Sequence, residues 1–258
     1  MPVTIVELYD IATKSIIKRS ETRQQRRPSR ESTQESEESH TRVDLIRLLT
    51  SIFYQAHSAS QLVITKAHLD AAARQLEGEG ERLLEVLVQR VLQDELPLLN
   101  LLQAEPLQMQ ASHLAVQEFY CAKAICEGQS LPTPPWQFTA WWANTLKLGE
   151  EMGPAFRRNL LAGVGVTGDA LSLEGQIGGH RPTALLALQQ LMAQLRSLDL
   201  SNNSLGATEA QAIAEALEGN GQLQSLILDV NAMIGDDGVS AIADSLLAPQ
   251  VKPGQAKP

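Results

Sequence analysis

The sequence is poor in cysteine and in aromatic residues. It holds two cysteines among 258 residues, and aromatic side chains make up 4% of it. Cys121 and Cys126 are five positions apart in a segment with helical spacing, so they point to different faces of a helix and are poorly placed for a disulfide. This argues against a disulfide-stapled secreted domain. It favours two reduced thiols and, from them, a cytoplasmic protein.

Long hydrophobic runs are also missing. No apolar segment approaches the roughly 20 residues needed to cross a bilayer, and the chain opens without the basic-then-apolar pattern of a secretory signal. We therefore expect no membrane partner. With 43% hydrophobic residues and a net charge of −9, the composition is that of a soluble globular protein, long enough for one large or two modest domains.

The motifs of common enzymes are absent as well. The phosphate-binding loop G-x-x-x-x-G-K-[ST] needs a Gly-Lys dipeptide, and the sequence has none; it also lacks the G-x-S-x-G elbow of serine hydrolases. Its five histidines are scattered, without cysteine or glutamate at metal-ligand spacing. We therefore predict no catalytic residue, no cofactor, no metal site and no enzymatic activity.

A repeated leucine pattern is the most informative feature that is present. Residues 195–203 read L-R-S-L-D-L-S-N-N, and 28 positions later residues 223–231 read L-Q-S-L-I-L-D-V-N. This is the L-x-x-L-x-L-x-x-N signature of a leucine-rich repeat, in which leucines face inward from a short strand. After Gly206 and after Gly235 the same apolar spacing of a helix follows. Each unit therefore predicts one strand and one helix.

A weaker copy of this unit lies upstream. Residues 171–179 align with residues 198–206, with Gln176 where asparagine is expected, and residues 184–195 supply the helix. A degenerate first unit is typical of the boundary of a repeat array. We therefore predict a short α/β leucine-rich-repeat solenoid with a parallel sheet over residues 167–248, made of one degenerate and two clear repeats.

The positions between the leucines project outward, on the face through which repeat proteins bind their partners. The predicted protein-binding residues on this strand face are Glu174, Ser197, Asp199, Ser201, Ser225, Ile227 and Asp229. We expect Glu174, Asp199 and Asp229 to form an acidic row. Residues 195–247 hold eight acidic residues against Arg196 alone, which favours a basic protein partner and disfavours nucleic acid. A solvated strand face without a partner is the alternative.

The last repeat has no polar cap after it. Because each repeat buries its sides only against its neighbours, the far side should expose the edges of Leu226, Leu228 or Ile242. We expect this end to self-associate or to be continued by a longer array.

Helical patterns dominate the chain before the repeats. Residues 1–19 predict an amphipathic helix with Thr4 and Glu7 as a capping box. Residues 20–41 are charged and nearly free of apolar side chains, so we predict a disordered linker. Within it, Arg26-Arg27-Pro28-Ser29 fits a site for a basophilic kinase or a nuclear import receptor, and a plain solvated linker is the alternative. Residues 249–258 predict a disordered tail.

Residues 42–166 predict a mainly α-helical, winged-helix-like domain. Helices precede and follow a short hairpin at residues 98–109, which is the element order of that fold. The helix at 113–126, taken as the recognition helix, has one lysine and one glutamate, so phosphate contacts would be poorly supplied. An aromatic cluster follows, which fits either a packed hinge or a partner-stacking surface; it comprises Trp136, Phe138, Trp141 and Trp142.

The segment around residues 112–125 resembles the H-L-[ST]-F-Q-E-[FY]-x-A-A segment of the NACHT family of NOD-like receptors. The positions that fit are His113, Leu114, Gln117, Glu118, Phe119 and Ala122, whereas Ala115 and Val116 depart from the pattern. Together with repeats that resemble the ribonuclease-inhibitor class, the resemblance covers residues 42–248. It implies the C-terminal part of such a receptor, without its ATPase core. His113 itself is expected to start a helix with local hydrogen bonds.

The resemblance implies a non-enzymatic interaction or regulatory module that signals through a protein partner. The alternative is a structural scaffold or gene fragment with no independent binding function. The missing phosphate-binding loop leaves no nucleotide-binding residue to assign.

Overall fold

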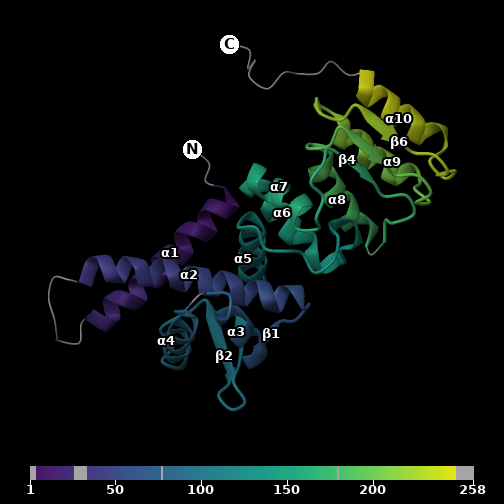
Figure 1. The fold of residues 1–258 in the computed structure, drawn as a ribbon. Coiled ribbons are helices and arrows are strands. Elements are labelled where there is room, and N and C mark those ends of the chain that lie inside the picture. Colours follow the sequence, from purple (N-terminus) through teal and green to yellow (C-terminus); the bar gives the residue numbers. More distant parts are fainter. Residues whose placement is uncertain (1–3, 26–33, 77, 179, 248–258) are drawn as a thin grey trace, which may run out of the picture. The chain divides into compact units, whose positions relative to one another are not determined.

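The computed structural model describes residues 4–25, 34–76, 78–178 and 180–247, with the side chains of 19–25 and 34–42 left out. It divides the chain into two compact units, Met1–Glu127 and Gly128–Pro258. The fold is mixed α/β: ten α-helices and two three-stranded sheets lie in the described residues (Figure 1). The predicted tail and the Arg26–Ser29 motif lie outside them.

Two long helices open the first unit: α1 spans Ile5–Gln25 and α2 spans Gln34–Ser58. The predicted capping box is confirmed, since the Thr4 N–H donates to Glu7 Oε2 at 3.0 Å and the Glu7 N–H donates to Thr4 Oγ1 at 3.1 Å. The predicted disordered linker, residues 20–41, is wrong at both ends, where the chain is helical. Glutamate and glutamine are good helix formers, so each helix propagates from its apolar part into the polar segment.

A small antiparallel sheet with three helices follows α2. The predicted hairpin is confirmed as β2 and β3, and a short strand that the sequence did not indicate, β1, pairs with β3 to give the order β1-β3-β2. The β1 strand was missed because only three residues separate the preceding loop from a helix. The elements are β1 (Val63–Thr65), α3 (Lys66–Ala73), α4 (Gly80–Leu92), β2 (Leu99–Gln103), β3 (Gln108–Ala111) and α5 (Leu114–Cys126).

The core of the first unit lies where α5 packs against α2. Phe53 of α2 stacks on Tyr120 of α5 at 5.1 Å between ring centroids, and Tyr9 of α1 stacks on Phe119 at 5.2 Å. Ile17 of α1 is fully buried. Burial of such aromatic pairs contributes both apolar area and ring-ring attraction, so α1 belongs to this core and is not a separate N-terminal element.

The second unit begins earlier than predicted. We expected residues 42–166 to form one domain, but the chain divides after Glu127, and residues 128–166 belong with the second sheet. The reason is direct hydrogen bonding: the carbonyl oxygens of Trp136 and Phe138 accept the Gly178 and His180 N–H groups. This entry segment holds two 3-10 turns, η1 (Pro135–Gln137) and η2 (Ala140–Trp142), followed by α6 (Ala143–Met152) and α7 (Pro154–Ala162).

The aromatic cluster packs this entry segment. Phe138 stacks on Trp142 with ring centroids 4.3 Å apart, and both side chains are buried together with Trp136. Trp141 is half-buried. Of the two interpretations of the cluster, burial favours packing over a partner-stacking surface, because three of the four rings have no exposed face to offer.

Three strand–helix units form the rest of the second unit. The first strand–helix unit is β4 (Ala170–Ser172) with α8 (Arg181–Met192). The second strand–helix unit is β5 (Ser197–Asp199) with α9 (Ala207–Leu217), and the third is β6 (Ser225–Ile227) with α10 (Gly235–Leu247). The strands are parallel in the order β4-β5-β6, with Leu171, Leu198 and Leu226 in register. Parallel strands need such crossovers, which place a helix in each connection.

Candidate interaction surface

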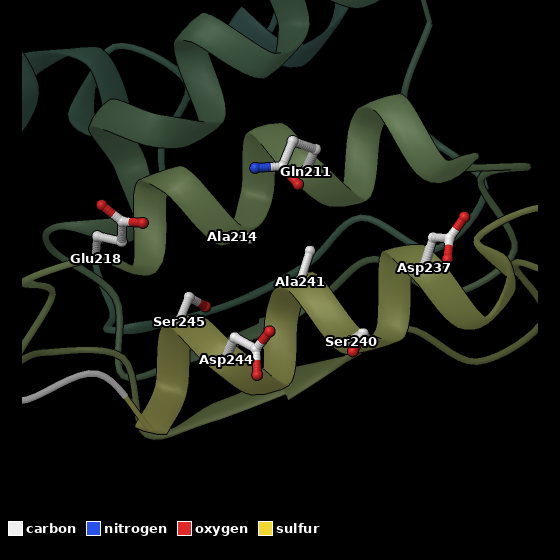
Figure 2. Close-up of a pocket in the computed structure, with 8 residues that line it drawn as sticks. All are labelled: Gln211, Ala214, Glu218, Asp237, Ser240, Ala241, Asp244 and Ser245. Carbon is white, nitrogen blue, oxygen red and sulfur yellow. The ribbon is translucent and has the colours of Figure 1, made fainter.

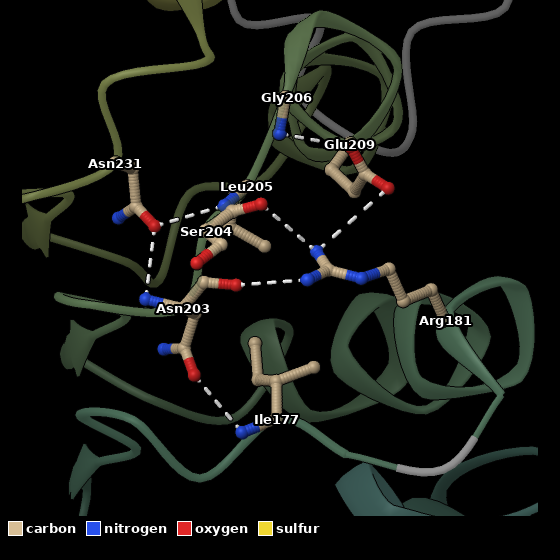
Figure 3. A network of polar contacts seen from close by, with 8 residues as sticks. All are labelled: Ile177, Arg181, Asn203, Ser204, Leu205, Gly206, Glu209 and Asn231. Atoms are coloured by element: carbon tan, nitrogen blue, oxygen red, sulfur yellow. Dashed lines mark hydrogen bonds and ion pairs between the residues drawn. The ribbon is translucent and has the colours of Figure 1, made fainter.

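Two asparagines connect the strand–helix units. The Asn203 side-chain amide donates to the Leu173 carbonyl of the first unit at 2.9 Å and to the Leu200 carbonyl of its own unit at 2.9 Å, while its Oδ1 accepts the Ile177 N–H at 2.9 Å. The Asn203 side chain is buried. Figure 3 shows its contact with Ile177. Buried backbone groups need partners where a strand ends, and asparagine has both donor and acceptor to supply them.

Asn231 makes the same contacts one unit later. Its Oδ1 accepts the N–H groups of Asn203 and Leu205, each at 3.0 Å, and its amide donates to the Leu200 carbonyl at 3.0 Å. Gln176 takes this place in the first unit, where it is exposed and reaches only the Ser172 carbonyl at 3.5 Å. The glutamine is therefore a weaker version of the asparagine contact.

Arg181 adds a fixing contact that the sequence did not indicate. Its guanidinium donates to the carbonyls of Asn203 and Ser204, each at 3.2 Å, and lies 3.9 Å from Glu209 Oε1 (Figure 3). Glu209 in turn accepts the Gly206 N–H at 2.9 Å. A planar guanidinium suits several oxygens at once. Nothing in the sequence marked Arg181, because it belongs to the first unit and its partners to the second.

The strand face carries a fixed carboxylate at its centre. Asp199 Oδ1 accepts from the Ser201 hydroxyl at 2.6 Å and from the Ser201 N–H at 2.9 Å, and Asp199 Oδ2 accepts from the Ser172 hydroxyl at 3.1 Å. The hydrogen bonds from Ser201 and Ser172 lower the pKa of Asp199 below its ordinary value. The carboxylate is thus both held in position and kept ionised.

The expected acidic row is not a straight row. Asp199 stands beside Ser172 and Ile227 in the strand register. The backbone bonds Gly175 N–H to Ser201 carbonyl and Asn202 N–H to Asp229 carbonyl place Glu174 and Asp229 on either side of Ser201. The three acids therefore lie in two successive rows, because side chains on one face of a strand are two residues apart. The alignment of residues 171–179 with residues 198–206 also pairs Glu174 with Ser201 and not with Asp199.

The predicted surface residues differ in exposure. Glu174, Ser225, Ile227 and Asp229 are exposed, Ser197 and Asp199 are half-buried, and Ser201 is buried. Ser201 is therefore a support for Asp199 and cannot meet a partner, which corrects its predicted role. Ser172, which the predicted set omitted, is exposed and bonded to Asp199.

The helical side of these units is acidic too. Between α9 and α10 lies a groove of about 410 Å³ (Figure 2). Glu218, Asp237 and Asp244 line it with polar or small side chains, and no lysine or arginine is among its lining residues. Both the strand side and the helical side therefore present carboxylates, which favours basic molecules around this end of the chain.

Groups with catalytic or metal-binding potential are dispersed elsewhere. Among the described residues, no three His, Cys, Asp or Glu side chains are placed to hold a metal ion. His57 is buried, and desolvation lowers its pKa to about 3. The two cysteines are not joined in a disulfide, and burial raises the pKa of Cys126 to about 11. His113 starts α5 as expected, with its Nδ1 accepting the Ala115 N–H at 3.1 Å.

The predicted recognition helix is misplaced. Much of α5 is buried, including Phe119 and Tyr120, so it has no face free to enter a nucleic-acid groove. The two helices that precede the hairpin are α3 and α4. On α4, Arg82 bonds to Glu79 at 2.7 Å and Arg90 is buried. The absence of a nucleic-acid partner stays a prediction.

None of the helices in the described part of the chain is both long and apolar enough to span a bilayer.

Comparison with known proteins gives no match: no protein-family model fits this sequence, and it matches no curated protein and no solved structure.

Proposed function

We propose that this protein is a non-enzymatic interaction or regulatory module, and that its strand face binds a basic protein partner. The observation that carries the proposal is the Asp199 carboxylate, which Ser172 and Ser201 hold in position, with exposed Glu174 and Asp229 in the next row of the same face. A carboxylate that is already fixed, as that of Asp199 is, loses little freedom on binding. The acidic groups together attract a basic partner at long range.

We further propose that the three strand–helix units are leucine-rich repeats of the ribonuclease-inhibitor type. Support comes from the 28-residue period, the leucines in register and the asparagine bonds between neighbouring units. A repeat array of this kind presents its strand face as a binding surface.

The first compact unit fits a winged-helix-like fold in this proposal. The order α2-β1-α3-α4-β2-β3, with sheet order β1-β3-β2, supports that assignment. The residues that resemble the NACHT-type motif lie on or just before α5, ahead of the repeats. We therefore propose the C-terminal part of a cytoplasmic NOD-like receptor, without its ATPase core.

A displayed library of random peptides, selected on the purified chain, tests the strand face. Selected peptides should be rich in lysine and arginine, and their binding should weaken roughly tenfold in Glu174→Lys and in Asp229→Lys. The matched control is Glu215→Lys, because Glu215 is exposed on α9 and the change in net charge is the same.

Equal weakening in the Glu215→Lys control would reduce the effect to nonspecific attraction. Failure to select any peptide, or unchanged binding in both strand-face variants, would favour the alternative of a scaffold without a binding function of its own.

A further inference from the structure

The outer side of the third strand–helix unit, β6 and α10, exposes apolar side chains. The corresponding side chains of the second strand–helix unit, β5 and α9, are buried. Aligned on Gly206 and Gly235, Val239 corresponds to Ala210 and Leu246 to Leu217. Val239 and Leu246 are 61% and 59% exposed, whereas Ala210 and Leu217 are 0% and 3% exposed. Exposed apolar area of this kind is stabilised by removal from water.

The strand of the last unit repeats this difference. Leu198 and Leu200 are fully buried, whereas their counterparts Leu226 and Leu228 are half-buried. The leucines of the second strand–helix unit are buried because the third strand–helix unit packs over them. No described element covers the last unit in the same way.

The backbone edge is open at the equivalent positions. In the second unit the Leu200 N–H donates to the Ile227 carbonyl at 2.8 Å and the Asn202 N–H donates to the Asp229 carbonyl at 2.9 Å. The corresponding N–H groups, those of Leu228 and Val230, have no acceptor among residues 180–247. An open strand edge of this kind is a template for a further strand.

The negative charge of the third strand–helix unit decides which kind of molecule can dock on its outer side. Residues 218–247 contain five acidic residues and no lysine, arginine or histidine: Glu218, Asp229, Asp236, Asp237 and Asp244. A second copy docked by a two-fold axis would bring two such sets together. Glu218, Asp237 and Asp244 line the groove beside α9, so they act on this place through the net negative charge of the unit, which attracts a basic occupant.

We propose that the β6 edge and the Val239–Leu246 side of α10 dock a further leucine-rich strand–helix unit of another polypeptide, with basic side chains on its helix. This surface is the outer side of the last described strand–helix unit and is distinct from the strand face, although both proposals use the repeat assignment. The incoming strand would supply carbonyl oxygens to the Leu228 and Val230 N–H groups, and the incoming leucines would cover Leu226 and Leu228.

The test supplies such a unit directly. A copy of residues 218–247 is inserted after Leu247 of the full chain, with Asp236→Lys and Asp244→Lys in the copy only. Hydrogen exchange of the Leu228 and Val230 amides should slow by roughly tenfold or more as they gain acceptors, and the melting temperature should rise by about 4 °C or more. Unchanged exchange at both amides would overturn the proposal.

Matched variants separate the surface and its charge preference. Val239→Asp with Leu246→Asp in the receiving unit should abolish the protection, and Glu174→Lys on the strand face should leave it intact, which distinguishes this proposal from the previous one. A copy that keeps its aspartates should protect less at low salt. Equal protection by the acidic copy would overturn the basic occupant. So would a dimer of the unaltered chain, seen by light scattering and abolished by Val239→Asp.

Discussion

At the scale of single residues, Asn203 replaces part of the strand pairing that its unit lacks. One side chain satisfies backbone groups in two units, with donors to Leu173 and Leu200 and an acceptor for Ile177. The leucines of the pattern supply burial, and the asparagine adds side-chain hydrogen bonds to the strand pairing that joins one strand–helix unit to the next. The free energy of unfolding should therefore be more sensitive at this position than its size suggests.

We expect Asn203→Ala to lower the free energy of unfolding by about 3 kcal/mol, because several buried backbone groups lose their partners at once. Urea unfolding followed by circular dichroism measures it. Gln211→Ala, at an exposed position of α9, is the control and should stay within about 0.5 kcal/mol of the parent. A loss no larger than that of the control would show that water replaces the asparagine.

His57 makes stability depend on pH. Its folded-state pKa is lowered to about 3 from an ordinary 6.5, because burial disfavours the charged imidazole. The unfolded chain therefore takes up the proton first. The contribution of this group to stability is complete above about pH 6.5 and is lost as the pH falls toward 3.

Between pH 6.5 and 4.5 we expect a loss of about 2 to 3 kcal/mol in the free energy of unfolding, which is about 1.4 kcal/mol per pKa unit. Burial lowers the pKa of His68 as well, so a His68→Gln variant isolates the His57 effect. Urea melts at several pH values should show a slope in the His68→Gln protein that flattens when His57→Gln is added. An unchanged slope after both substitutions would assign the acid sensitivity to other groups.

At the scale of elements, α9 and α10 approach each other through a glycine. A Cβ on Gly238 would lie 2.8 Å from the Ala210 Cβ and 2.7 Å from the Ile234 Cγ2. Ordinary van der Waals contact needs more room than this. The glycine therefore sets how closely the third unit can stack on the second.

Gly238→Ala should consequently destabilise the chain by about 1 to 3 kcal/mol through overpacking, although alanine is the better helix former by about 1 kcal/mol. Thermal unfolding of this variant and of Ser240→Ala, at an exposed position of the same helix, checks the prediction. Stabilisation by Gly238→Ala would mean that the helices separate at little cost.

The elements also show how far sequence reasoning reached. The strands of the second and third units, their helices and the hairpin follow from local periodicity, so the sequence predicted them. The β1 strand could not be predicted in this way, because three residues are too few to show a periodic pattern. The linker between α1 and α2 was judged from low hydrophobicity alone, and that criterion overlooks the helix propensity of glutamate and glutamine.

The sequence predicted only those features of the candidate site that follow from a local pattern. Exposed Glu174, Ser225, Ile227 and Asp229 follow from strand alternation, which the leucine spacing fixes. The burial of Ser201 and the contact of Arg181 with the Asn203 and Ser204 carbonyls depend on side-chain geometry across units. The Arg181 contacts join residues 22 or more positions apart, and no local pattern encodes them.

At the scale of the whole molecule, the chain consists of two compact units that meet in sequence at Glu127 and Gly128. Each has its own buried core, around Phe53 and Tyr120 in the first and around Phe138 and Leu198 in the second. Domains with separate cores can fold separately. The boundary therefore defines an experiment.

Residues 1–127 and residues 128–258, expressed apart, should each give a cooperative thermal transition and retain their helical circular dichroism signal. A fragment that ends at residue 166, the boundary expected from the sequence, should unfold less cooperatively because residues 128–166 lose the Gly178 and His180 contacts. Loss of structure in either of the first two fragments would mean that the units depend on each other.

The asparagine contacts couple each strand–helix unit only to its immediate neighbours. A nearest-neighbour array behaves as a one-dimensional chain of coupled two-state segments, so opening is directional. Among the described residues the third strand–helix unit has one coupled neighbour, whereas the first is also bonded to the entry segment through Gly178 and His180. The third should therefore fray first, and each further segment costs an additional coupling free energy. During such fraying Ile227 and Asp229 leave the binding surface before Asp199 does, so a partner that contacts all three would slow the fraying and gain affinity from the order it imposes.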